Sequence, residues 1–155
     1  MSAASAIAAL RQAGIRTGVV AGKLRLVAPP TVIARVVTPE VRQDLIADAT
    51  GVLDALREDV LAILEHAVAE ENDRHRRWRA AVEKRGVSAN VGSWLREVAP
   101  DLRERIHAAE DEIDVAVLAV NETALRAALG SWRHRWSTAR IGFEYFAGLR
   151  DDDDG

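Results

Sequence analysis

The chain of 155 residues contains no cysteine, and aromatic residues make up only 5% of it. The absence of cysteine excludes disulfides, thiolate metal ligands and thiol nucleophiles. Long apolar runs are also absent: residues 115–120 form a run of about six, whereas a transmembrane helix needs roughly 20. Residues 1–6 carry no basic side chain ahead of the apolar ones. We therefore expect no membrane span, no secretory signal and a cytoplasmic location.

A large charge of one sign is lacking as well. The 21 lysine and arginine residues nearly balance the 24 aspartate and glutamate residues, which leaves a formal charge of -3. No overall field then attracts nucleic acid or acidic membranes, so such a partner would need a local patch. Hydrophobic residues make up 48% of the chain, which is enough for the core of one domain or of two small ones.

Two short helices are predicted within the first 50 residues. The alanine-rich residues 4–13 favour a helix, and Gly14 is suited to end it. Residues 38–40, Thr-Pro-Glu, have the order of an N-cap, a first-turn proline and a first-turn acid. This second helix is expected to run to about residue 49, where Thr50-Gly51 breaks or bends the chain.

A β-hairpin is predicted between these helices. Residues 23–26 alternate charged and apolar side chains, which is typical of a half-buried strand. Residues 21–22, Ala-Gly, supply a tight turn that pairs this strand with residues 15–20. Residues 32–37 are rich in valine and isoleucine and are a candidate third strand.

The order of these segments carries a family resemblance. It comprises Gly14-Ile15, Gly-Lys-Leu-Arg-Leu-Val-Ala-Pro at residues 22–29, Thr-Pro-Glu at residues 38–40, and the leucines Leu53, Leu56, Leu61 and Leu64. Over residues 4–64 this order resembles the TubC-type N-terminal docking domain. The resemblance implies a helix–hairpin–helix–helix head that binds the tail of another protein along its hairpin. The expected peptide-binding residues are Arg16, Val19, Lys23, Arg25 and Val27.

The acidic C-terminal tail, residues 151–155, has two interpretations. By itself a run of aspartates is typical of a solvated chain end. The docking resemblance adds the alternative that the tail is a ligand for the basic hairpin of another copy, which would give head-to-tail assembly.

The remainder of the chain is predicted to be helical. A long helix is expected over residues 52–86, a short helix capped by Ser93, and a further helix that begins at Pro100. Apolar residues then recur with alternating spacings of four and three along residues 102–146, apart from a slip of one residue near Asn121. Such spacing is typical of a coiled coil or bundle, and the slip indicates a bend or a change of partner helix.

The aromatic end of this last helix is a predicted oligomer interface. If residues 51–85 and 101–147 paired as a helical hairpin, the second helix would extend beyond the first. Overhanging aromatic side chains favour a partner, here another copy of the chain. The predicted interface residues are Leu125, Leu129, Trp132, Trp136, Phe143 and Phe146.

Catalytic and metal motifs are weak. Glu104 and His107 have the Glu-x-x-His spacing of di-iron bundles, but no second copy of this motif exists. Serines lack a Gly-x-Ser-x-Gly elbow, and Gly22-Lys23 lacks the remaining residues of a P-loop. We therefore predict no enzyme activity, no metal and no cofactor.

Two basic segments were weighed as nucleic-acid contacts. Residues 74–79 contain four arginines that point in nearly every direction on a helix, so a salt-bridged, solvated helix is expected there. Arg126, Arg133 and Arg140 recur every seven residues and would share one stripe. This stripe supports the alternative function, a small nucleic-acid-associated accessory protein.

The sequence thus predicts an α+β protein with a docking-like head at residues 1–50, a helical hairpin or coiled-coil region at 51–150 and the acidic tail. Its predicted function is a non-catalytic protein–protein interaction or assembly subunit. The head would capture a peptide from a protein partner or from another copy, and the helices would mediate oligomerisation.

Overall fold

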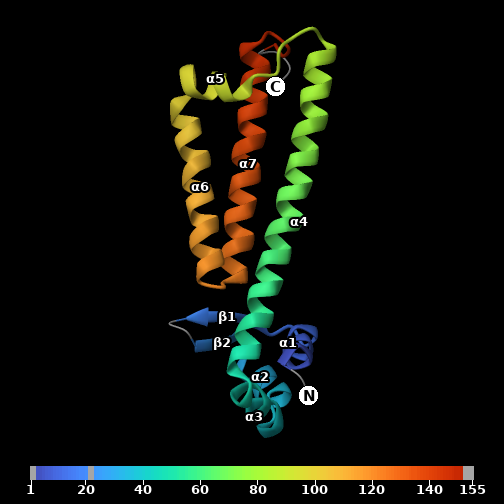
Figure 1. The fold of residues 1–155 in the computed structure, drawn as a ribbon, viewed down its shortest axis with the longest axis vertical. Coiled ribbons are helices and arrows are strands. Elements are labelled where there is room, and N and C mark those ends of the chain that lie inside the picture. The colour runs from blue at the N-terminus through green and yellow to red at the C-terminus, as the bar shows by residue number, and fades with distance from the viewer. Residues whose placement is uncertain (1–2, 21–22, 152–155) are drawn as a thin grey trace. The chain divides into compact units, whose positions relative to one another are not determined.

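The computed structural model describes residues 3–20 and 23–151 and is mostly helical, with one two-stranded antiparallel sheet (Figure 1). An α+β class is therefore compatible with the fold. The chain divides into two compact units. The hairpin unit comprises residues 1–63 and 115–125, and the helical unit comprises residues 64–114 and 126–155. The head thus takes in more of the chain than the predicted residues 1–50.

Helix α1 (Ala3–Gln12) opens the hairpin unit. Ile7 and Leu10 are buried on its inner face, as is Ile15 directly after it. Gly14 has a φ of 79°, and its amide donates to the carbonyl of Arg11 at 2.9 Å. The predicted glycine stop is confirmed, because only glycine adopts this conformation without strain.

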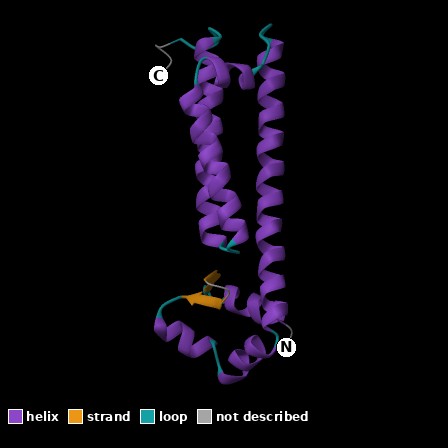
Figure 2. Cartoon of the chain, turned by 60° about the vertical axis from the view of Figure 1, so that its left-hand side comes forward, coloured by secondary structure: helices purple, strands orange, loops and turns teal. Residues whose placement is uncertain are grey.

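Strands β1 (Arg16–Val20) and β2 (Lys23–Val27) form the predicted hairpin, drawn in orange in Figure 2. The register pairs Arg16 with Val27 and Val19 with Leu24. The predicted turn at residues 21–22 lies outside the described residues.

Residues 32–37 do not form a third strand. Residues 32–36 belong to helix α2 (Pro30–Val36), which has Pro30 in its first turn, and Val37 is its C-cap. The fixed φ of proline favours the first turn of a helix, and this local start outweighs the strand propensity of the β-branched residues that follow. Helix α3 (Pro39–Ala47) then begins as predicted, with the Thr38 hydroxyl accepting from the amide of Val41 at 3.3 Å.

Helix α4 (Ala49–Lys84) begins earlier than expected. Helix α3 ends at its C-cap Asp48, whose carboxylate accepts a hydrogen bond from the amide of Gly51 at 3.1 Å. Thr50 and Gly51 are therefore the first turn of α4 and not a breaker. At the other end Gly86 has a φ of 82°, which confirms the predicted stop.

Three further helices follow. Helix α5 (Val91–Glu97) is capped by Asn90 and not by Ser93: the Asn90 side chain accepts from the Ser93 amide at 3.1 Å. Helix α6 (Pro100–Leu118) begins at the predicted proline, and helix α7 (Glu122–Phe146) completes the fold. Helices α6 and α7 lie side by side in both views (Figures 1 and 2).

The predicted single helix over residues 101–147 is wrong. Val120 has a φ of 49°, and the Asn121 side chain accepts from the amide of Ala124 at 3.0 Å, which caps α7. The slip in the apolar spacing therefore marks a turn between two antiparallel helices. Both helices keep the same spacing because each faces a helical core.

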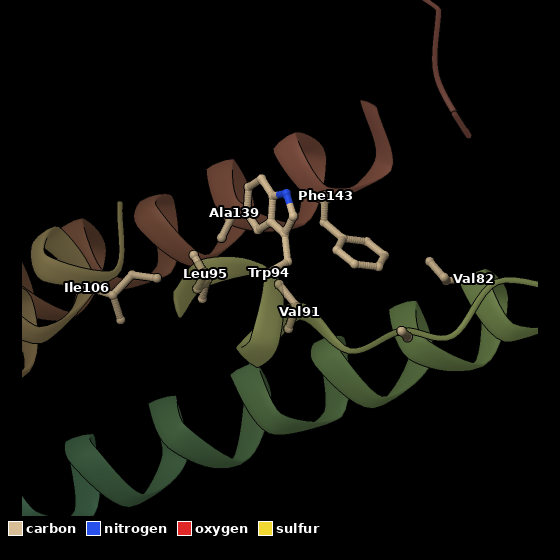
Figure 3. Close-up of a cluster of buried hydrophobic side chains, with 8 residues drawn as sticks. Val82, Val91, Trp94, Leu95, Ile106, Ala139 and Phe143 are labelled. Carbon is tan, nitrogen blue, oxygen red and sulfur yellow. The ribbon is translucent and has the colours of Figure 1, made fainter. Parts of the chain in front are cut away.

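The core of the helical unit contains an aromatic pair among aliphatic side chains. Trp94 of α5 packs against Phe143 of α7, with ring centroids 6.1 Å apart at 89° (Figure 3). Gly142 permits this approach, since a Cβ there would lie 2.9 Å from the Trp94 ring. Around them lie Val82, Val91, Leu95, Ile106 and Ala139. Among the described helices, none is long and apolar enough to cross a membrane.

Candidate functional site: the hairpin face

The hairpin presents one basic, exposed face. Residues paired across an antiparallel sheet point to the same side, so Arg16 and Val27 share a face with Arg25 and Lys23. All four side chains are exposed, and Val27 keeps 55% of its surface accessible. Arg16, Lys23 and Arg25 make no ion pair with any described residue. Four of the five predicted peptide-binding residues are thus brought together.

Val19 lies on the opposite face of the hairpin. There it pairs with Leu24, next to the pair formed by Thr17 and Leu26. Thr17 is buried and the other three are half-buried, so this face belongs to the packed side of the unit. The prediction of Val19 as a site residue is wrong: Val19 lies three residues after Arg16 in the same strand, and alternation puts residues at that spacing on opposite faces.

The sheet has two strands within the described residues, so each strand has one edge that pairs with no further strand. An edge strand presents backbone N–H and C=O groups that can pair with an additional strand. Strand β2 also carries Lys23, Arg25 and Val27, so its outer edge lies beside three of the exposed side chains.

Arg11 fixes the unit that carries this hairpin. Its Nη1 lies 2.6 Å from Oδ2 of Asp59, and its Nη2 lies 2.9 Å from Oε2 of Glu122. The sequence analysis missed this residue. A cation in the last turn of the first helix was the available signal, since basic side chains are favoured there.

The predicted aromatic oligomer interface is mostly covered within one chain. Leu125, Leu129 and Phe143 are buried, and Trp132 and Trp136 pack against the core of the helical unit. Because the chain turns at Asn121, residues 101–147 form two helices, and the predicted single helix longer than residues 51–85 does not exist. Phe146 alone of the six is largely exposed, at 63%. The prediction that the aromatic end of one long helix overhangs its partner helix is therefore wrong.

The predicted arginine stripe is exposed only in part: Arg126 is exposed, Arg133 is half-buried and Arg140 is buried. Arg140 is only 6% exposed, and its Nη1 lies 2.8 Å from Oε1 of Glu71, which is 3% exposed. The second oxygen of Glu71 lies 2.5 Å from Nη1 of Arg74. A buried, neutralised arginine is not available to a phosphate, so the stripe loses one of its three members.

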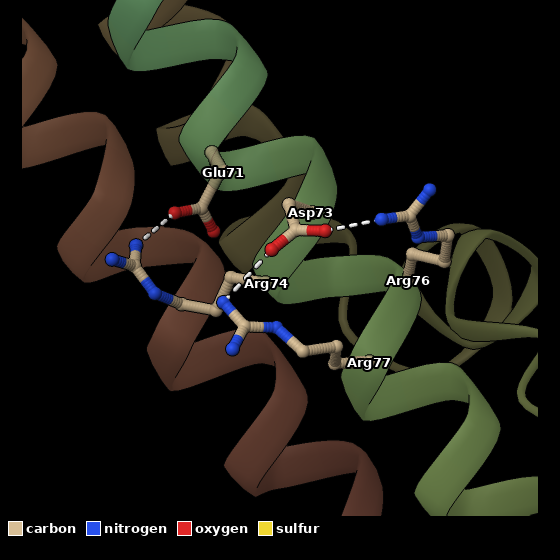
Figure 4. Close-up of polar contacts among 5 residues, drawn as sticks. All are labelled: Glu71, Asp73, Arg74, Arg76 and Arg77. Carbon is tan, nitrogen blue, oxygen red and sulfur yellow. Dashed lines mark hydrogen bonds and ion pairs between the residues drawn. The ribbon is translucent and has the colours of Figure 1, made fainter.

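The basic segment of α4 is a salt-bridged helix, as predicted. Asp73 pairs with both Arg76 and Arg77, the latter at 2.9 Å, and Glu71 pairs with Arg74 (Figure 4). These arginines are therefore largely neutralised along their own helix.

Metal ligation finds no geometric support in the described residues. Glu104 and His107 are exposed on α6, and the described chain contains no group of three or more histidine, aspartate or glutamate side chains that could hold an ion. In the tail, Asp151 is exposed and Arg150 lies 2.5 Å from Oε2 of Glu144; residues 152–155 lie outside the described part.

Comparison with family models, characterised proteins and solved structures finds no match to this chain.

Proposed function

We propose that the hairpin unit is a non-catalytic docking head that binds an acidic peptide as an added strand along β2. The observation that carries the proposal is the exposed face of Arg16, Lys23 and Arg25, three cations without a carboxylate partner in the described residues. The order of elements, which resembles the TubC-type docking domain, supports the same function.

In strand addition, the backbone of β2 supplies affinity and its exposed side chains supply selectivity. Backbone pairing with the outer edge of β2 supplies affinity for any extended segment. Selection comes from alternate side chains: Lys23, Arg25 and Val27 follow one another on the exposed face. A peptide with acidic residues at alternate positions, followed by an apolar one, fits this order. The chain's own residues 151–154 are four consecutive aspartates and so satisfy the acidic part.

A peptide titration tests the charge requirement. A labelled peptide with the sequence of residues 146–155 is titrated with the full chain and with the double variant Lys23→Glu/Arg25→Glu. Reversal should weaken binding by roughly tenfold or more, and added salt should weaken it too, because exposed charges are screened over about 10 Å at 0.1 M salt. The matched control is Arg42→Glu/Arg57→Glu, which reverses two exposed charges on α3 and α4 and should bind as the parent does.

Backbone pairing is tested separately with N-methylated peptides. A strand at the edge of a sheet pairs through every second amide, so methylation of one alternating set should abolish binding while the other set is tolerated. Equal binding by both methylated peptides, or equal binding by parent and reversed head, would contradict strand addition. An acidic peptide of unrelated sequence that binds in place of residues 146–155 would identify the partner as a different protein.

A further inference from the structure

A hollow in the helical unit is separate from the hairpin and is not explained by the docking function. It has a volume of about 450 Å³ and lies between His75 and Arg79 of α4, residues 88–92 at the start of α5, and Trp136 of α7. A neighbouring hollow of about 460 Å³ shares His75 and Arg79, and one of about 230 Å³ shares Gly92 and Trp136. Small-molecule sites typically enclose roughly 300–1,000 Å³, so the first hollow has a suitable size.

One wall of the hollow is aromatic. The His75 imidazole lies 5.6 Å from the Trp136 indole at 65° and 5.4 Å from the Trp78 indole. Burial, followed by repulsion from Arg140 and Arg79, lowers the pKa of His75. The ring is therefore neutral near pH 7 and able to donate one hydrogen bond and accept another. No hydrogen bond from a described residue uses either nitrogen.

A weakly held cation stands beside this wall. The guanidinium of Arg79 lies 3.8 Å from the carboxylate of Glu83, at the outer limit of an ion pair, and both side chains are more than half exposed. Exposed pairs of this kind contribute little and are readily exchanged for another anion. Arg140, by contrast, is neutralised by buried Glu71 and is not free to bind a ligand.

We propose that this hollow binds a small anion that carries a planar ring. The ring lies against Trp136 and His75, and the carboxylate or phosphate group pairs with Arg79. Planar rings favour offset or edge-on contact with aromatic side chains, and a guanidinium binds a carboxylate or phosphate through two parallel hydrogen bonds. The proposal does not depend on peptide binding by the hairpin unit.

Four probes test the ligand chemistry on the full chain: 2-naphthoate, 2-naphthyl phosphate, the uncharged 2-naphthamide and acetate. Calorimetry should give a Kd on the order of 1 mM or tighter for at least one naphthyl anion. The amide should bind at least tenfold more weakly, and acetate should not bind. Comparison of the two anions tells whether the natural ligand is a carboxylate or a phosphate.

Variants locate the site. Arg79→Gln, an exposed substitution that should not affect folding, should weaken binding of the naphthyl anion at least tenfold. The control Arg57→Gln, on the same helix but in the other unit, should leave binding unchanged. In nitrogen–proton correlation spectra, the conservative variant Trp136→Phe identifies the Trp136 indole signal, which should move most upon addition of the anion.

The proposal would be overturned by no binding of either naphthyl anion, by equal affinity for the anion and its amide, or by largest spectral changes at indoles other than Trp136. Unchanged affinity in Arg79→Gln would do so as well, because the charge would then be recognised elsewhere.

Discussion

The two units of this chain are built from different side chains. All seven aromatic residues lie in the helical unit, while residues 1–63 and 115–125 contain none. The hairpin unit has an aliphatic core and places its strand cations on the surface. The helical unit buries a charged pair, Glu71 and Arg140, next to an aromatic cluster. The first unit keeps its strand cations on the surface, whereas the second buries one charged pair inside its own packing.

This difference also supplies a way to observe the units separately. Tryptophan fluorescence reports only the helical unit, because all four tryptophans belong to it. Far-ultraviolet circular dichroism reports helices of both units. Denaturant unfolding followed by both methods therefore shows in which unit a substitution acts, and the predictions below use this pair of measurements.

Breaking the buried charge pair should have the largest effect. Glu71→Leu leaves Arg140 buried without a carboxylate and should lower the free energy of unfolding by about 3–5 kcal/mol. Arg140→Met should cost less, since Glu71 keeps Arg74 at 2.5 Å. The double variant should recover most of the loss, because a well-packed apolar pair is often as stable as the ion pair it replaces. Urea unfolding followed by fluorescence measures all three.

The matched control lies in the hairpin unit. Arg11 also pairs with two carboxylates, but the three side chains are between 24% and 41% exposed. Arg11→Met should therefore cost about 1 kcal/mol or less, visible by circular dichroism. If Arg11→Met cost as much as Glu71→Leu, the contrast between a surface and a buried use of charge would be wrong.

The close packing of α5 on α7 gives the next largest effect. Gly142→Ala would place a Cβ 2.9 Å from the Trp94 ring, which is rigid and held in the core, and should destabilise by about 1–3 kcal/mol. Gly130→Ala on the same helix meets no atom within 4 Å and should stabilise by up to about 1 kcal/mol. Thermal unfolding of both variants measures these opposite changes in stability. A gain in stability in Gly142→Ala would contradict the close contact.

Much of the fold followed from local sequence rules. Gly14 and Gly86 end helices, and Thr38 and Pro100 begin them, because each acts on the few residues beside it. The error at residues 32–37 was also local: β-branched propensity was given more weight than the helix start at Pro30.

The sequence predicts which side chains share a face within each strand, but not which faces of the two strands lie on the same side of the hairpin. Alternation along residues 23–27 identified the exposed cations, and alternation along β1 already separates Val19 from Arg16. That Arg16 shares the face of Lys23 and Arg25 depends on its pairing with Val27. Long-range contacts were beyond sequence reasoning. The seven-residue recurrence that included Arg140 showed that the arginines share a face, but not that Glu71, far away in the chain, faces one of them. The aromatic stripe was likewise consistent with an intermolecular seam until the turn at Asn121 was known.

Helix caps should give effects of about 1 kcal/mol. Asn121→Ala removes the acceptor for the Ala124 amide at 3.0 Å and should cost about 1 kcal/mol, whereas Asn121→Asp keeps an acceptor and should cost little. Thr38→Ala, whose hydroxyl accepts at the longer distance of 3.3 Å, should cost about 0.5 kcal/mol. Circular dichroism during urea unfolding measures these losses, and a neutral Asn121→Ala would contradict the capped turn between α6 and α7.

The smallest expected effect is a pH dependence confined to the helical unit. Burial and the neighbouring Arg140 and Arg79 lower the pKa of His75 below its ordinary value of 6.5. The unfolded chain therefore binds more protons than the folded chain just below pH 6.5, so the free energy of unfolding falls as the pH is lowered through this range. The fall ends once His75 is also protonated in the folded state.

His75→Gln should flatten this part of the profile when unfolding is followed by tryptophan fluorescence. The control His134→Gln, exposed on α7, should keep the slope of the parent chain. If His75→Gln retained the full slope, the helical unit would not hold this imidazole in its neutral form.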